Sequence, residues 1–165
     1  MNRLIKFIAL FLIIGVFSNL CACNIIEGET SSKNTQDESS YKLYYIVDSD
    51  KVGIIGFDDR MSSSNISTMQ AEIEKAGYSV EYVEFRGKND VIIPDSIEGY
   101  SVFAIDGAAF NGCASIKSID IPSSVQIIEP GAFEKCASDM IIHGESGSAA
   151  EESAKENNIS FEIKQ

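Results

Sequence analysis

The chain has 165 residues, with 13 basic and 25 acidic side chains and a formal charge of −12. This acidic balance repels nucleic acid and anionic lipid and favours neutral or cationic partners, so it excludes a nucleic-acid-binding function. A chain of this length is typical of one modest domain or of two small, closely packed units.

The N-terminal residues have the three parts of an export signal. Arg3 and Lys6 precede an unbroken apolar run at 7–17, and the tetrapeptide Leu20-Cys21-Ala22-Cys23 follows. The apolar run is shorter than the roughly 20 residues that a membrane-spanning helix needs. Leu three places before Cys23, with Ala just before it, resembles the bacterial lipobox, which implies lipid attachment at Cys23 and removal of residues 1–22. An ordinary secretory leader and an uncleaved anchor remain open as alternatives.

Residues 23–40 are rich in Ser, Thr, Asn, Gln and acidic side chains, with hardly an apolar position after Ile26. Such a segment cannot bury enough surface to offset the entropy of ordering, so we predict a disordered polar tether. Loss of Arg3 and Lys6 with the leader would leave 11 basic against 25 acidic residues, which gives the mature chain a formal charge of −14.

The next segment, 41–86, predicts an N-terminal unit with the order strand, strand, helix, strand. Its first two apolar runs flank turn residues and favour a hairpin. Ser67-Thr-Met-Gln70 fits a capping box, and Gly77 is typical of a helix C-terminus. The predicted elements are strands at 41–47, 52–57 and 78–85 and a helix from Ser67 to Gly77.

A partial calcium-loop pattern overlaps this unit. Asp48, Asp50 and Gly53 have the spacing of an EF-hand loop, with Asp59 at the twelfth place. Val52 stands where the loop needs Asp or Asn, and the last ligand would have to be a bidentate Glu. We therefore predict no metal site, and no cofactor is implied elsewhere.

An internal repeat with a constant offset of 23 residues begins in the second half of the chain. A fixed period in the 20s is the sequence signature of a solenoid. Each copy follows an Ile-Pro step, at Ile93 and Ile121, where Pro ends a strand because it cannot donate to the ladder. The first copy carries five extra residues around 98–101. The repeated residues are Val102, Ile105, Ala109, Phe110, Cys113, Ala114 and Ser115, which recur as Val125, Ile128, Ala132, Phe133, Cys136, Ala137 and Ser138.

The segments 93–113 and 121–136, with their Ile-Pro step and Ala-Phe-x-x-Cys core, resemble the BspA-like leucine-rich repeat. The closing stretch 141–161 is similar to the C-terminal cap of such proteins. The resemblance covers about half of the chain. It implies an α/β fold in which residues 87–165 form a short leucine-rich-repeat-like solenoid of about two coils.

Two coils cannot close a core alone, so the flanking segments must supply caps. We predict a β-β-α-β cap at the N-terminal end and a helix-strand cap at the C-terminal end. Ser148-Ala-Ala-Glu151 is a capping box that opens a helix through Glu156, and Ile159 to Ile163 follows as a strand.

Candidate binding residues follow from strand alternation. Ile119 should point into the core and Asp120 outward, onto the open face of the parallel sheet. We predict that Ile92, Asp120 and His143 form a short outward row that binds a protein partner. Because the row is short, the contact should be weak.

The remaining chemistry-bearing residues favour structural roles. His143 is the only histidine, and the sequence holds no nucleophile motif with which it could act, so we predict a strand residue facing solvent and no enzyme activity. Cys113 and Cys136 occupy equivalent places in successive coils. We favour a stacked pair of buried thiols over a disulfide, which remains the alternative in an exported protein.

Together the leader and the resemblance imply a monomeric, lipid-anchored protein at the cell membrane or cell surface, outside the cytoplasm. It would bind an unidentified protein or act in adhesion. The alternative is an envelope scaffold or accessory subunit, in which the unit 41–86 docks on a membrane complex and the repeat only stabilises it.

Overall fold

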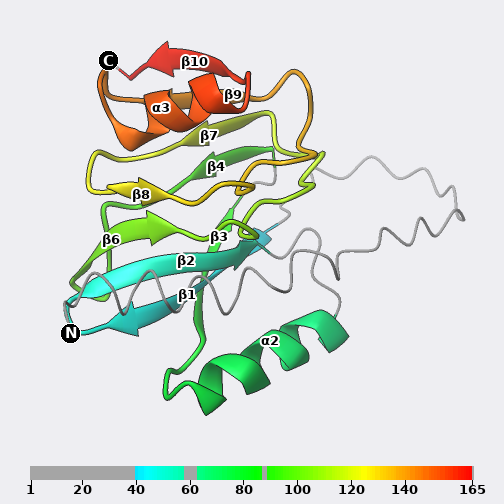
Figure 1. Ribbon diagram of the computed structural model, residues 1–165, viewed down its shortest axis with the longest axis vertical. Helices are drawn as coiled ribbons and strands as arrows, with labels where there is room; N and C mark the ends of the chain where they lie inside the picture. Colours follow the sequence, from blue (N-terminus) through cyan, green and yellow to red (C-terminus); the bar gives the residue numbers. More distant parts are fainter. Residues whose placement is uncertain (1–39, 58–62, 87–88, 165) are drawn as a thin grey trace, which may run out of the picture.

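The described part of the chain opens with a hairpin, in a computed structural model that covers residues 40–57, 63–86 and 89–164. Strand β1 (Ser40–Asp48) pairs antiparallel with β2 (Lys51–Phe57) (Figure 1). Helix α2 (Ser63–Lys75) follows, and β3 (Glu81–Arg86) returns along the other edge of β1. The order strand, strand, helix, strand is the one that the sequence predicts.

The boundaries of α2 and β3 differ from the prediction. The helix begins at Ser63, so Ser67 lies inside it and its capping-box pattern does not mark the start. The predicted stop is confirmed, because Gly77 has a φ of 89° and the Tyr78 N–H donates to Ile73 O at 3.2 Å, which closes the helix end. Strand β3 starts at Glu81, three residues after the predicted position.

The repeated part of the chain alternates between two sheets that face each other across a core (Figure 1). Sheet A has the order β3-β1-β2-β6-β5, with β8 also paired to β6, and sheet B has the order β10-β9-β7-β4. All neighbours in sheet B are parallel. The elements are β4 (Asp90–Ile92), β5 (Ser96–Ile97), β6 (Tyr100–Ile105), β7 (Ser118–Asp120), β8 (Ile127–Ile128), β9 (Ile141–Gly144), α3 (Ala149–Glu156) and β10 (Ser160–Ile163).

The sheet register reproduces the sequence repeat. Ser118 of β7 pairs with Ile141 of β9, 23 positions later, whereas Asp90 of β4 pairs with Ser118, 28 positions later. The five additional residues are accommodated in the tight hairpin of β5 and β6, whose two turn residues Glu98 and Gly99 both have positive φ.

The N-terminal hairpin continues sheet A, because β2 pairs parallel with β6. One face of the hairpin, including Leu43 and Ile54, joins the core enclosed by sheets A and B. The opposite face, including Ile46, is covered by Met69 and Ile73 of α2. Both faces of the hairpin are therefore buried, which explains its nearly continuous apolar sequence.

The C-terminal cap has the predicted helix and strand. Ser148 precedes α3 and accepts the Glu151 N–H at 3.4 Å, while the Glu151 side chain accepts the Gly147 N–H at 2.6 Å. Gly144 allows α3 to pack closely on β9, since a Cβ there would lie 2.9 Å from Ala150 Cβ. The capping box at Ser148 therefore predicts where α3 begins.

Several sequence predictions fall on residues outside the described ranges: the leader, Cys23, the tether up to residue 39, and Asp59 of the partial calcium loop. Within the described ranges, every helix is too short or too polar to cross a membrane.

Candidate binding face

The outer face of sheet B brings the three predicted binding residues into one line. The pairing registers place Ile92 of β4 beside Asp120 of β7, Asp120 beside His143 of β9, and His143 beside Glu162 of β10. We call these four residues the cross-strand row. Ile119, which precedes Asp120 in β7, is fully buried. The predicted alternation of inward and outward side chains in this strand is therefore confirmed.

The centre of the cross-strand row is held by charge-assisted contacts. Asp120 Oδ1 lies 2.8 Å from His143 Nδ1, and Asp120 Oδ2 lies 3.0 Å from Lys164 Nζ. His143 Nε2 lies 3.6 Å from Glu162 Oε2. The His143 side chain is 29 % exposed, so the expectation of a simple solvent-facing residue is incomplete: the ring is half-buried between two carboxylates.

Electrostatics favour the ionised form of Asp120. Partial burial alone would raise the pKa of this carboxyl, but hydrogen bonds from Lys164 and His143 outweigh it and hold the pKa below its usual value. A charged Asp120 therefore keeps the ring and the ammonium group in place. The row is preorganised in its centre and open at its ends.

The two ends of the cross-strand row are accessible. Ile92 is 55 % exposed, and the Glu162 side chain is 66 % exposed. One end thus offers an apolar contact and the other a negative charge. The adjacent row of the same face holds Asp90, Ser118, Ile141 and Ser160. Within it, Ser118 Oγ donates to Asp90 Oδ1 at 2.6 Å.

Sequence reasoning did not include Glu162 and Lys164 in this face. It predicts a strand at 159–163, but the sequence does not show that β10 lies parallel beside β9 as the fourth strand of sheet B. Given this pairing register, strand alternation places Glu162 in line with His143. The register itself depends on how the chain folds back after α3, and this is set by tertiary packing.

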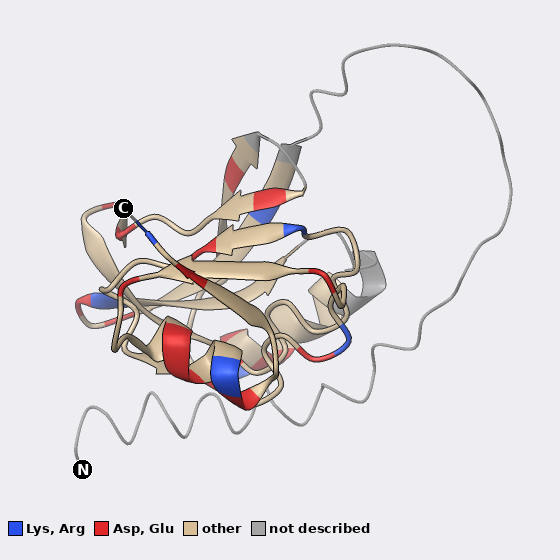
Figure 2. Ribbon diagram, turned by 90° about the horizontal axis from the view of Figure 1, so that it is seen from above, with Lys and Arg blue, Asp and Glu red and all other residues tan. Residues whose placement is uncertain are grey.

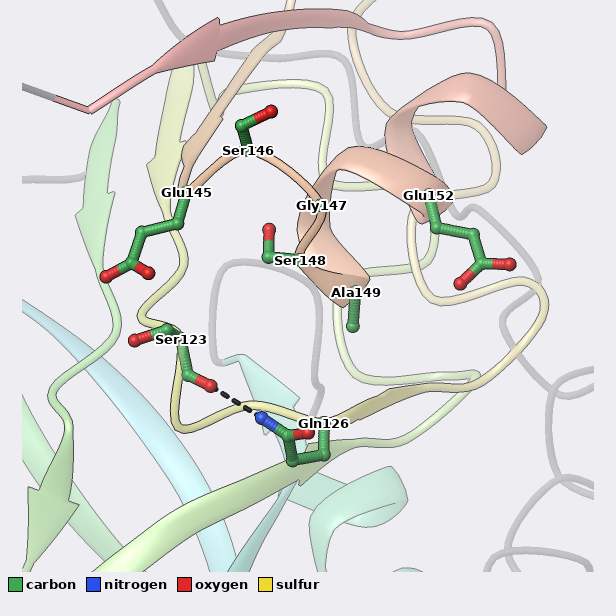
Figure 3. A pocket seen from close by; sticks show the side chains of 8 residues that line it. All are labelled: Ser123, Gln126, Glu145, Ser146, Gly147, Ser148, Ala149 and Glu152. Atoms are coloured by element: carbon green, nitrogen blue, oxygen red, sulfur yellow. Dashed lines mark hydrogen bonds between the residues drawn. The ribbon is translucent and has the colours of Figure 1, made fainter.

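An open hollow of about 370 Å³ lies beside the N-terminus of α3 (Figure 3). Its lining is polar and includes the carboxylates of Glu145 and Glu152, while the Gln126 amide donates to Ser123 O at 2.7 Å. The Gly147 N–H at the helix start already has a carboxylate partner within the chain. The Glu151 N–H is likewise bonded to Ser148 Oγ, and two carboxylates line the hollow, so its lining disfavours an anion.

Charged positions elsewhere do not form a metal centre among the described residues, where no group of three or more His, Cys, Asp or Glu side chains is arranged to hold an ion. Figure 2 shows acidic positions spread over strands, loops and α3 rather than gathered at one point.

One acidic group is buried away from sheet B. Asp106, directly after β6, has no exposed surface; its Oδ1 accepts the Ala108 N–H at 2.8 Å, and its Oδ2 has no hydrogen-bond partner. Burial raises the pKa of Asp106 to about 7; the Ala108 N–H opposes this rise, and the charge of Glu129 adds to it. A carboxyl with such a shift is expected to make the stability of the fold depend on pH.

The two cysteines of the repeat are not bonded to each other in the structure. Cys113 is buried and Cys136 is partly buried, each against the main core. The favoured prediction of a stacked pair of buried thiols fits the burial of Cys113, whereas Cys136 is only partly buried.

Comparison with known proteins identifies the repeated segment. Residues 84–162 match the family model described as the BspA type leucine rich repeat region of six copies. No curated protein and no solved structure matches the chain. The matched residues contain sheet B except for Ile163, and they include the whole cross-strand row. Residues 84–162 of the chain are therefore a BspA-type leucine-rich repeat region.

Proposed function

We propose that this chain is a membrane-anchored lipoprotein outside the cytoplasm, which binds a protein partner through the outer face of sheet B. Leucine-rich repeats commonly serve as protein-interaction modules, and stacked repeats present continuous surfaces for that purpose. The observation that carries the proposal is the cross-strand row, in which an ion-paired centre lies between the exposed ends Ile92 and Glu162.

In this proposal the alternation between sheets A and B makes a short solenoid of two coils, closed by the N-terminal unit and by α3 with β10. Sheet B then offers four short strands as a binding surface. A face of this size falls at the small end of specific interfaces. The expected affinity is therefore modest, with most of the binding energy in a few exposed contacts.

Replacing Ile92 with Asp should weaken partner binding at least about tenfold, which corresponds to the loss of about 1.4 kcal/mol from one apolar contact. Ile92 is exposed, so the change removes the apolar end of the row without opening the core. The measurement is a pull-down with a fragment that begins near Tyr41, followed by titration of the captured protein. Circular dichroism checks that the variant is folded.

The matched control is Tyr82→Asp, because Tyr82 is 54 % exposed against 55 % for Ile92 and lies on β3, in the other sheet. It should leave the affinity unchanged. Loss of binding in Tyr82→Asp with retention in Ile92→Asp would contradict the proposal and favour docking through the N-terminal unit.

Replacing Cys23 with Ser should release the protein from the membrane fraction into the medium or the soluble envelope fraction. The proposed lipid at Cys23 would supply two acyl chains, at about 0.8 kcal/mol per buried methylene, and no described helix could replace them. Fractionation with an antibody measures the distribution. Cys21→Ser is the control and should stay attached; membrane retention of the Cys23→Ser protein would refute the anchor.

A further inference from the structure

The loops that follow β6 and β8 are joined by backbone hydrogen bonds. The Phe110 N–H donates to Ala132 O at 3.1 Å, and the Gly112 N–H donates to Glu134 O. These bonds stack the first loop on the second in the register of the sequence repeat. The residues that follow, Cys113 and Cys136, are 23 positions apart and hold the same place in each loop.

Both cysteines converge on one carbonyl oxygen. Phe110 O accepts the Cys113 backbone N–H at 3.0 Å and the Cys136 thiol at 3.2 Å. The Cys136 sulfur therefore lies no farther than about 6 Å from the Cys113 nitrogen. Cys113 belongs to the main core, and Cys136 packs against it.

We propose that Cys113 and Cys136 are a redox pair, reduced in this structure, that closes to an intramolecular disulfide joining the two repeats when the protein meets a disulfide oxidant. Hydrogen-bonded neighbouring backbones lie about 4.8 Å apart, which is inside the Cα separation of about 4.4–6.8 Å that disulfides adopt. The backbones just before the two cysteines are bonded in this way, so we expect the disulfide to form mainly by rotation of the two side chains.

The exchange has a defined order because the two thiols differ in burial. Cys113 is 1 % exposed, whereas Cys136 is partly exposed and meets the oxidant first. Its thiolate attacks oxidised glutathione, which forms a mixed disulfide and releases one glutathione thiolate. The Cys113 thiolate then attacks the Cys136 sulfur and displaces the second glutathione. Two protein thiols are oxidised, and one glutathione disulfide is reduced to two thiols.

The experiment uses the full chain in detergent with Cys21→Ser and Cys23→Ser, so that only the two repeat cysteines remain. The folded protein is titrated with oxidised glutathione and analysed by intact mass spectrometry. The expected product is a monomer that has lost two hydrogens and carries no glutathione. Its Tm should rise by about 10 °C, since the bond constrains the unfolded chain, and a reductant should reverse the rise.

Removal of Cys113 should trap the reaction halfway. Cys113→Ser should stop with one glutathione on Cys136 and show no reversible Tm rise, and Cys113→Ala serves as a second variant should buried Ser impair folding. A two-thiol protein that stops at the glutathione adduct, forms only intermolecular dimers, or forms the bond only in denaturant would overturn the proposal.

Discussion

Replacing Asp106 with Asn is expected to raise the free energy of unfolding at pH 8 by about 2 kcal/mol and to remove most of the pH dependence between pH 5 and pH 8. The pKa of Asp106 is about 7 in the folded chain, against 3.8 for an ordinary Asp. Each unit of difference between the folded and ordinary pKa values corresponds to about 1.4 kcal/mol of unfolding free energy. The shift of Asp106 would therefore cost the folded protein about 4 kcal/mol once the carboxyl is ionised. In the variant, the amide NH₂ takes the place of Oδ2, which has no hydrogen-bond partner. The buried NH₂ is then also unsatisfied, so the variant gains only part of this energy.

The sign of the pH dependence follows from the number of protons that the folded and unfolded states bind. Between the two pKa values the folded protein holds a proton on Asp106 and the unfolded chain does not, so the free energy of unfolding falls as the pH rises. The stabilising contribution of this proton is complete below about pH 4 and is lost as the pH passes about 7. Above that pH the fold contains a buried carboxylate with one partnerless oxygen.

Urea unfolding at pH 5 and pH 8 measures the effect, with Asp50→Asn as the control because Asp50 lies exposed in the hairpin turn. The control should have the same pH dependence as the unchanged chain. Equal pH slopes for the Asp106→Asn variant and the unchanged chain would show that Asp106 does not titrate in this range.

The sequence offers no signal for the burial of Asp106. Strand alternation accounts for Ile105, but the position after it belongs to a loop, where acidic residues are normally solvated. Burial comes from stacking of the loops: a Cβ at Gly107 would lie 2.5 Å from Pro130 O, so the two backbones are in contact there. Such contacts between loops depend on tertiary structure, and residue periodicity does not record them.

The repeat itself was predictable because its physical cause lies in the sequence. Identical residues at a constant offset must occupy equivalent places if neighbouring units stack, and the pairing of β7 with β9 follows that offset. The caps were predictable only as elements. Capping chemistry indicated the helix before Glu156, whereas the parallel pairing of β2 with β6 has no local signature.

The candidate site also has a part that the sequence predicts and a part that it does not. Outward positions on β4, β7 and β9 follow from alternation and repeat offset, so Ile92, Asp120 and His143 were found together. The ion pairs of Asp120 required the position of Lys164, which lies beyond β10 and outside the repeat. Sequence patterns therefore indicated which residues share a face and did not indicate how their charges are satisfied.

The largest single loss of stability is expected for Phe110→Ala, which should lower the free energy of unfolding by about 3–5 kcal/mol. Phe110 has no exposed surface, and its ring centroid lies 5.7 Å from that of Phe57 and 5.6 Å from that of Phe133. These three rings belong to the N-terminal hairpin, the first repeat and the second repeat. Truncation of Phe110 leaves a cavity between the other two rings. The expected loss is a large part of a typical domain stability of about 5–15 kcal/mol.

The shape of the unfolding transition tests whether the N-terminal unit and the repeats fold as one body. Because Phe57 of β2 packs on Phe110 and β2 pairs with β6, both near-ultraviolet and far-ultraviolet signals should shift together in the Phe110→Ala variant. Tyr82→Ala is the control, because its side chain is 54 % exposed and its ring contacts the Tyr44 ring and the Lys42 ammonium group, so its loss should cost only about 1 kcal/mol. Two separated transitions in the variant would mean that residues 41–86 unfold independently. The hairpin would then be an attached domain rather than the cap that completes the core.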